Sequence, residues 1–365
     1  MSAGPGAFAA SYAEARARFL AAAAAAGVPA EAMRHPLRGR EGEELALDVA
    51  RDGHPNASRL LIVSSGCHGV EGFCGSVVQV ALLADAGFRA RAQAAGVAVL
   101  YLHALNPYGF SHLRRTTHEN IDLNRNFVDF DFPLPVNVAY REVHPLLVPR
   151  QWPPEPENTA AVQEYLARHG ARVMQAVTSG GQYEFPDGLF FGGTATSWSQ
   201  RALREALHSH GHRAGRIAWI DVHSGLGPSG VGERIQGGRH DPASVARARA
   251  WWDGGGRTPV TSVQEGTSSS AQVTGTMQHA AYDECPQAEF TGLVLEFGTA
   301  PLMETLQALR AEQWLNAHPE APPALEAAIR RQILQAFYVD SDEWRGKVLA
   351  QAKEAALQAV EGLGA

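Results

Sequence analysis

Short apolar runs alternate along the chain with longer segments of helical periodicity, and this alternation constrains the fold more than any other feature. Strands that are buried on both faces of a sheet read as near-continuous apolar runs of this length. The expected strands are 60–64, 97–102, 217–222, 260–263 and 292–297. The expected helices are 10–26, 74–86, 158–170, 198–211, 241–253, 302–316, 322–337 and 341–361. Strands that alternate with helices in this way predict an α/β fold whose sheet is covered on both faces.

Length and charge exclude several classes of protein. A chain of 365 residues can bury a large core. Its net charge of −7, with no Lys/Arg run longer than two residues, argues against a nucleic-acid or anionic-membrane partner. The three cysteines, Cys67, Cys74 and Cys285, do not make a disulfide framework in a chain of this length.

Two segments outside the apolar runs have a distinctive composition. The N-terminal segment 8–26 is rich in alanine and is followed by Gly27, which predicts an amphipathic helix. It has no basic start and no apolar stretch long enough to span a bilayer, so we expect a cytoplasmic protein with no membrane partner. The region 128–195 is the least regular and contains stretches rich in glycine and aromatic residues. Insertions of this kind are more often functional loops or lids than scaffold.

A histidine and a carboxylate, His68 and Glu71, lie three residues apart directly after the first expected strand. Imidazole and carboxylate are zinc ligands, and a catalytic zinc ion usually has three protein ligands. His223, at the end of another apolar run, is the candidate for the third ligand. Taken singly, each signal has an ordinary alternative, because a His-x-x-Glu pair arises by chance in many chains and His223 alone would more often be a satisfied core histidine.

Cys67 adjoins His68 and could be read as a metal ligand or as a nucleophile. We prefer a packing role for it. Successive side chains on an extended backbone point in opposite directions, and small thiols pack readily in cores.

Two arginines lie between the metal-ligand candidates. Arg115 follows the motif Asn106-Pro-Tyr-Gly109, and Arg125 ends the motif Asp122-Leu-Asn124-Arg125. A guanidinium beside an amide suits a substrate with a free terminal carboxylate, and a second arginine could stabilise the oxyanion that forms when water attacks a carbonyl. The alternative for the second motif is a structural ion pair between Asp122 and Arg125.

Glu296 ends the apolar run 293–295, where a buried strand should not carry an unpaired charge. A carboxylate there needs a partner or a chemical role, and a zinc hydrolase requires a general base. Ligands of open α/β sheets bind beyond the carboxyl ends of the strands. We therefore expect one crevice to collect His68, Asn106, His223 and Glu296.

In this order the motifs resemble those of the zinc carboxypeptidase superfamily, the carboxypeptidase A-like metallopeptidases. The resemblance covers residues 55–300 and consists of His-x-x-Glu, Asn-Pro-x-Gly, an arginine ten residues before Arg125, Asp-Leu-Asn-Arg-Asn-Phe, Asp-x-His-Ser-Gly and a glutamate that closes the last core strand. The chain is most similar to a bacterial branch whose members begin with a similar Tyr-x-Glu-Ala-Arg helix. The fold implied is a single three-layer α/β/α domain, residues 1–365, around a mixed, mostly parallel sheet, with C-terminal helices within 302–361.

The resemblance also implies a cofactor and its ligands. One Zn²⁺ ion would be bound by His68, Glu71 and His223. Asp122 would orient the ring of His68, since a ligating imidazole needs a partner for its other N–H.

The same resemblance implies the roles of the remaining site residues. Arg115 would polarise the scissile carbonyl, and Asn124 and Arg125 would hold the terminal carboxylate of the substrate. Glu296 would act as general base toward a metal-bound water and then as general acid toward the leaving amine. The implied reaction is zinc-dependent hydrolysis of an amide bond next to a free carboxylate, most simply by a metallopeptidase of carboxypeptidase type acting on peptides.

Two departures from the family pattern leave the substrate open. The stretch before Glu296 lacks the mobile tyrosine usual in carboxypeptidases, and Tyr282 is the nearest one. The ending Glu296-Phe-Gly298 resembles that of the aspartoacylase and succinylglutamate desuccinylase group, so a deacylase of N-acyl amino acids is the alternative. A deep, closed pocket would favour the deacylase, and an open trough would favour peptides. A non-catalytic binding protein of the same fold is a third hypothesis, against which the presence of both Glu296 and Arg115 argues.

Overall fold

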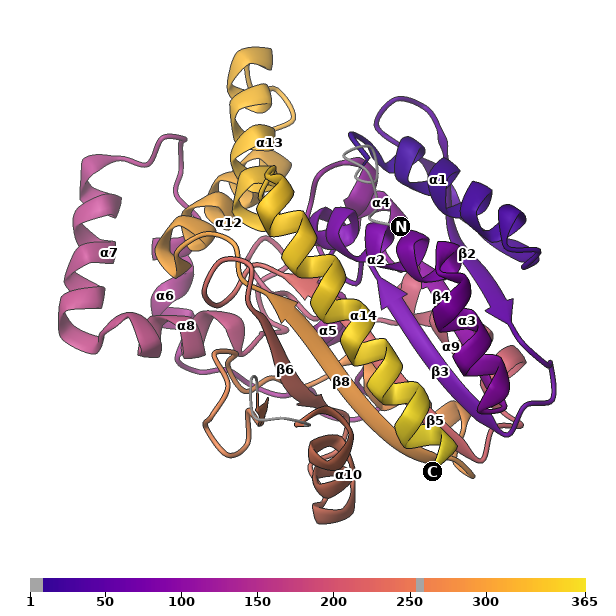
Figure 1. Ribbon diagram of the computed structural model, residues 1–365. Helices are drawn as coiled ribbons and strands as arrows, with labels where there is room; N and C mark the ends of the chain where they lie inside the picture. Colours follow the sequence, from indigo (N-terminus) through magenta and orange to yellow (C-terminus); the bar gives the residue numbers. More distant parts are fainter. Residues whose placement is uncertain (1–8, 254–258) are drawn as a thin grey trace.

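The computed structural model describes residues 9–253 and 259–365 and is built around one eight-stranded sheet (Figure 1). The strands are β1 Ala30–Arg38, β2 Glu44–Asp52, β3 Arg59–Ser65, β4 Val97–His103, β5 Arg216–Ser224, β6 Gly232–Gly237, β7 Val260–Thr261 and β8 Glu289–Phe297. Their order across the sheet is β1-β2-β4-β3-β5-β8-β6-β7. The central strands β4, β3, β5 and β8 are parallel, and antiparallel pairings attach β2 and β6 at either side. The expected α/β fold with a mixed, mostly parallel sheet is confirmed.

Helices cover both faces of the sheet and make the three layers that were expected. The helices are α1 Tyr12–Ala25, α2 Gly72–Ala84, α3 Ala86–Ala94, α4 Pro107–Ser111, α5 Leu123–Asn126, α6 Tyr140–Leu147, α7 Pro156–His169, α8 Ala171–Ser179, α9 Trp198–Gly211, α10 Pro242–Trp252, α11 Ala280–Glu284, α12 Leu302–Ala317, α13 Pro323–Phe337 and α14 Asp342–Gly364, with short 3₁₀ turns η1 Gly69–Glu71 and η2 Met277–His279. One face packs against α1, α2, α3, α10 and α14, and the other against α9 and α11. Figure 1 shows α14 lying along the sheet beside α2 and α3.

Side chains alternate between the two faces of each central strand. In β3, Leu61 and Val63 enter the core under α2 and α14, whereas Leu60 and Ile62 enter the core under α9. Both faces are buried, and this explains why the strand reads as a continuous apolar run. The polar residues that follow β3 lie at the edge of the sheet that is formed by the carboxyl ends of the parallel strands.

The structure corrects several expectations about individual elements. The expected strand 260–263 is only two residues long, and β1, β2 and β6 were not expected. Within the region 128–195, the expected helix 158–170 is confirmed as α7, whereas α6 and α8 were not expected. These helices pack with α12 and α13 into a third apolar cluster. The expected N-terminal helix begins at Tyr12, and residue 8 lies outside the described residues.

Among the described residues, no single helix has the length and hydropathy of a membrane span. Residues 69–84 and 86–94 meet the requirement only when taken together, and the pair is bent by 73°. Most residues of α2, which forms the larger part of this pair, are buried in the protein.

A buried histidine at the end of β4 predicts a pH dependence of stability. The ring of His103 is fully buried, stacks on Phe19 at 4.4 Å and lies 2.9 Å from the hydroxyl of Ser76 through Nε2. Its Nδ1 lies 3.9 Å from Asp48, which is itself held by Arg16 at 2.7 Å. Burial lowers the pKa of His103 to about 3.

We therefore expect acid to destabilise the protein through His103. The unfolded chain binds a proton on this ring below about pH 6.5, whereas the folded chain does not until about pH 3, so stability falls as the pH falls between these values. Between pH 7 and pH 5 the loss should be about 2 kcal/mol. Urea unfolding at both pH values, in the wild type and in His103→Gln, measures this loss, because contributions shared by the two proteins cancel. An equal pH dependence in both would contradict the prediction.

Candidate metal and catalytic site

The carboxyl ends of three neighbouring parallel strands bring the candidate residues together. His68 lies in the turn after β3, His223 lies near the end of β5, and Glu296 lies near the end of β8. The register of β5 and β8 places His223 directly beside Glu296. Glu71 follows His68 by three residues in the turn η1. All four side chains are buried and line the same cavity.

Glu71 lies between the two histidine rings. Its Oε1 is 2.9 Å from Nδ1 of His68, and its Oε2 is 2.9 Å from Nδ1 of His223. The ring centroids of the two histidines are 4.9 Å apart. One atom from each of the three residues lies within 4.8 Å of the other two. Ligands on a tetrahedral ion with bonds of about 2 Å are about 3.3 Å apart, so this group of two nitrogens and a carboxylate could hold a metal such as zinc.

Two further carboxylates orient the rings from behind. Nε2 of His68 lies 3.2 Å from Oδ1 of Asp122, and Nε2 of His223 lies 2.5 Å from Oδ2 of Asp221. Metal-ligating histidines usually donate their second N–H to such a partner, which fixes the orientation of the ring. The sequence suggested Asp122 for this task. Asp221 lies two residues before His223, a spacing that puts both side chains on the same face of a strand.

The buried charges of this group shift one another's ionisation. Burial alone would raise the pKa of Glu71, but the two imidazoles hold it well below its usual range. Burial alone would lower the pKa of His223, but the carboxylates of Asp221 and Glu71 outweigh it and raise that pKa well above its usual value. Nδ1 and Nε2 of His223 each lie within hydrogen-bond distance of a carboxylate, an arrangement that favours the protonated ring. A metal that takes its Nδ1 must displace a proton.

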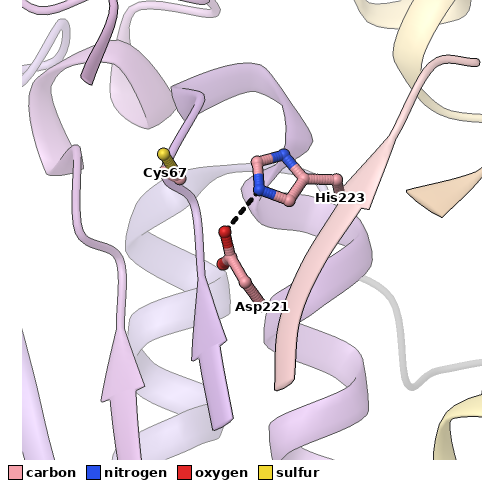
Figure 2. Close-up of side chains that lie close together, drawn as sticks. All are labelled: Cys67, Asp221 and His223. Atoms are coloured by element: carbon pink, nitrogen blue, oxygen red, sulfur yellow. Dashed lines mark hydrogen bonds and ion pairs between the residues drawn. The ribbon is translucent and has the colours of Figure 1, made fainter. Parts of the chain in front are cut away.

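A second group of potential ligands overlaps with the first. Cys67, Asp221 and His223 also place one ligand atom each within 4.8 Å of one another. In Figure 2 a dashed line joins Asp221 to His223, but none joins Cys67 to either residue. Burial raises the pKa of the Cys67 thiol well above its usual value, and the surrounding carboxylates raise it further. Because the thiolate is the form that attacks or binds metal, this environment favours the packing role.

Arg115 is held against the metal-ligand candidates. Its guanidinium donates to Asp122 at 2.9 Å and to Glu71 at 3.2 Å, and it lies 2.8 Å from Nε2 of His68. The contacts of His68 with Asp122 and with Arg115 require opposite tautomers, because the first uses the Nε2–H and the second uses the Nε2 lone pair. A His68 that gives up its Nδ1 lone pair to a metal keeps the Nε2–H, so its contact with Asp122 is then favoured over that with Arg115.

Asn124 and Arg125 lie on α5 at another side of the cavity. Three N–H groups of Arg125 donate to main-chain carbonyls, at 3.1 and 2.5 Å to Ser179 and at 2.9 Å to Asn124. The side-chain oxygen of Asn124 accepts from the N–H of Met277 at 3.0 Å, which leaves its amide nitrogen for other contacts. Asp122 and Arg125 are 3.8 Å apart, so the ion-pair alternative also has a geometric basis. The guanidinium has five N–H donors, of which two are left for a ligand.

Glu296 faces the cavity as a buried carboxylate that is 8% exposed. One of its oxygens accepts from the N–H of Leu226 at 3.1 Å. Burial and the negative charge of Glu71 raise the pKa of Glu296 to about 8. A carboxyl group in this environment can exchange a proton near neutral pH.

Among the residues expected here, Asn106 is the exception: its side chain caps α4 by accepting from the N–H of Gly109 at 2.9 Å and does not line the cavity. The cavity has a volume of about 210 Å³. Its lining includes His68, Glu71, Arg115, Asn124, Arg125, His223 and Glu296, and Asp122 lies directly behind His68 and Arg115. The roles assigned to these residues stay predictions. The sequence did not reveal Phe190, whose ring lies 4.8 Å from Arg115 and 5.4 Å from Arg125. Tyr282 contacts Arg239 instead of the cavity.

Solved structures with this fold are carboxypeptidase-like proteins. The crystal structure of thrombin-activatable fibrinolysis inhibitor is 12% identical, with a TM-score of 0.50, over 96% of this chain and 74% of that one. The bovine form of that protein, in complex with tick carboxypeptidase inhibitor, is 12% identical, with a TM-score of 0.52, over 98% and 97%. The chain thus has the zinc carboxypeptidase-like fold that the sequence resemblance implied.

A comparison of sequences shows the family to which the chain belongs. A family model described as "Protein of unknown function (DUF2817)" matches residues 8–351, and the chain belongs to this family. No curated protein matches the sequence.

The two overlapping groups of ligands predict different effects of mutation on metal binding. We expect one Zn²⁺ per chain, and we expect His68→Ala and His223→Ala each to weaken binding at least about 100-fold because a ligand is lost. Cys67→Ala should change the dissociation constant by no more than about threefold, since this side chain only packs. Competition titration with a chromophoric chelator measures all four proteins. A large loss of affinity in Cys67→Ala would indicate that the metal is held instead by Cys67, Asp221 and His223.

The turn that carries His68 and Glu71 also predicts a steric effect. A β-carbon on Gly69 would lie 2.1 Å from the carbonyl carbon of Gly109. Gly69→Ala must therefore displace the turn, with an expected loss of about 2 kcal/mol or more in unfolding free energy and weaker metal binding. Gly346→Ala is the control, because nothing lies within 4 Å of its β-carbon, and it should stabilise α14 by about 0.5–1 kcal/mol. Urea unfolding and metal titration measure both variants, and a Gly69→Ala protein as stable as the wild type would disprove the close contact.

Proposed function

We propose that the protein is a metal-dependent hydrolase of carboxypeptidase type, which cleaves an amide bond next to a free carboxylate. One observation carries the proposal. A single cavity collects a three-residue metal-ligand group, a buried carboxylate on the adjacent strand and two guanidinium groups. A site that only bound a metal or an anion would not need Glu296 and Arg115 in addition.

His68, Glu71 and His223 would hold the ion, and the two nitrogens and one oxygen that they offer suit zinc. When bound there, the ion would supply Lewis-acid catalysis at the carbonyl of the substrate. Asp122 and Asp221 keep the two rings in place, as their distances of 3.2 and 2.5 Å from the Nε2 atoms indicate.

Glu296 would move the protons of the reaction. With its pKa raised to about 8, this carboxyl group is poised to take a proton from the attacking water and to return it to the leaving amine. The N–H of Leu226 holds one carboxylate oxygen, and this contact fixes the side chain at the cavity. The side chain of Arg115 is 12% exposed and donates to Glu71. It would stabilise the negative charge that develops on the carbonyl oxygen.

The free carboxylate of the substrate would lie at the α5 end of the cavity. Arg125 has two N–H donors beyond its contacts with Ser179 and Asn124, and the preceding residue Asn124 also lines the cavity. A planar guanidinium with a neighbouring amide donor suits a terminal carboxylate.

A second substrate class is favoured by the depth of the site. His68, Glu71, His223 and Glu296 are only 2–8% exposed, and the cavity measures about 210 Å³. Helices α8, α12 and α13 contribute to its wall. Such a site suits a small N-acyl amino acid or a short peptide better than a long polypeptide in an open trough.

The proposal predicts the result of one substitution at Glu296. Zinc-loaded wild type should hydrolyse members of a panel of C-terminally free peptides and N-acyl amino acids, and Glu296→Gln should lower kcat by about 10²–10⁴-fold. The substitution keeps the shape of the side chain, so zinc stoichiometry should not change. Product formation is measured by mass spectrometry.

The matched control is Glu289→Gln on the same strand, whose side chain is 42% exposed and faces Arg216. This variant should keep wild-type activity. The proposal fails if zinc binds stoichiometrically and no member of the panel is cleaved, or if Glu296→Gln cleaves as fast as the wild type.

A further inference from the structure

The cavity has two chemically different walls. Its polar wall consists of Gln236, Gly237 and Gly238 at the end of β6, and of Thr276, Gln278 and His279 at η2. The polar wall adjoins Asn124, whose side-chain oxygen accepts from the N–H of Met277. Its apolar wall is formed mainly by Met174 on α8, Met303, Leu306 and Leu309 on α12, and Phe337 on α13, and the polar side chains of Gln175, Thr178 and Thr305 lie on the same helices.

The apolar wall lies beside the reactive groups. A β-carbon on Gly225 would be 2.7 Å from the ring of Phe337 and 3.8 Å from Oε1 of Glu296, so the ring and the carboxylate are neighbours. Phe190, which lies against Arg115, belongs to the same apolar cluster as Leu306 and Leu309. That cluster also contains Val70, the residue before Glu71. The apolar wall thus borders the metal-ligand group and Arg115, whereas the polar wall borders Asn124.

The apolar wall is fixed in position and carries no cation. Arg114, the residue before Arg115, donates to Glu312 of α12 at 2.5 Å, and both side chains are at most 4% exposed. Among the described residues that line the cavity, the basic side chains are Arg115, Arg125 and the histidines 68, 223 and 279. Each of these lies at the reactive centre, at the α5 end or on the polar wall. A second carboxylate on the side of α12 would therefore be buried without a partner.

We propose that the protein selects substrates with an uncharged, apolar group on the acyl side of the scissile amide. This inference rests on the proposed function, and it adds the chemistry of the group that the apolar wall receives. An aliphatic or aromatic acyl chain, or an apolar residue in that position of a short peptide, would fill the space between Leu306, Leu309 and Phe337. A dicarboxylic acyl group such as succinyl would be disfavoured.

The test is a series of N-acylglycines that differ only in the acyl group. Affinity is measured by calorimetry with the zinc-loaded Glu296→Gln protein, which binds without turnover, and kcat/KM is measured with the wild type. From acetyl to hexanoyl the dissociation constant should fall about fourfold per added methylene. The 4-methylpentanoyl compound should bind about 10- to 100-fold more tightly than its isostere, the succinyl compound.

A positive charge introduced into the apolar wall tests for a gain of function, namely tighter binding of the succinyl compound than in the wild type, which misfolding cannot mimic. Leu306→Arg should reduce the preference for 4-methylpentanoyl over succinyl by at least about tenfold, because it supplies the missing cation. Val173→Arg is the control, since Val173 lies on α8 but is 43% exposed and does not line the cavity. This control should leave the preference unchanged.

The two levels of proposal fail in different ways. Affinity that is independent of acyl length, or tighter binding of the succinyl compound, would overturn the apolar selectivity whether or not the amide is cleaved. Preferential binding of apolar compounds without hydrolysis of any compound would support the selectivity for apolar acyl groups and overturn the proposed function.

Discussion

The structure of the site depends on one buried chain of alternating carboxylates and imidazoles, which runs from Asp122 through His68, Glu71 and His223 to Asp221. All five side chains are at most 5% exposed. Buried charges are tolerated only when they are paired, and here the pairing determines where the surrounding elements must lie. β3 and β5 must be neighbours so that Glu71 reaches both rings, and the segment before α5 must return to place Asp122 behind His68. Arg115 then joins the chain through Asp122 and Glu71. The protonation of His223 and the ionisation of Glu71 follow from this mutual compensation.

The elements that the sequence predicted best are those whose surroundings are uniform. β3, β4, β5 and β8 are buried on both faces, so their central residues are mainly apolar and their positions could be read directly. The helix expected over 198–211 matches α9 at both ends, and Ser197 caps it with its side chain. β1 is mostly exposed, and β6 contains Glu233 and Arg234, whose partners come from distant segments. Strands of this kind have no local signal, because their burial and hydrogen bonds are decided by the rest of the fold.

The site was partly predictable for a related reason. Its reactive residues follow apolar strands, and the carboxyl ends of adjacent parallel strands meet at one edge. The order of motifs therefore indicated His68, Glu71, His223 and Glu296 before any contact was known. The walls of the cavity were not predictable, because Phe190 and the apolar faces of α8 and α12 meet the reactive residues only through tertiary packing. The region 128–195, which was expected to supply functional loops, contributes Phe190 from a loop and Met174 from α8 to the lining of the cavity, and its helices pack with α12 and α13.

Glu71 and His223 are 152 residues apart in the chain, and their contact has a consequence for biosynthesis. The first half of the metal-ligand group leaves the ribosome with β3 and β4, but it gains its third donor only when β5 has been made and has inserted beside β3. Such long-range pairing is slow, because the chain loses conformational entropy on closing the loop before it gains any stabilising contact. A nascent or misfolded chain therefore offers at most two of the three donors at one place. Tight metal binding would therefore stabilise only those chains in which the central sheet has formed correctly.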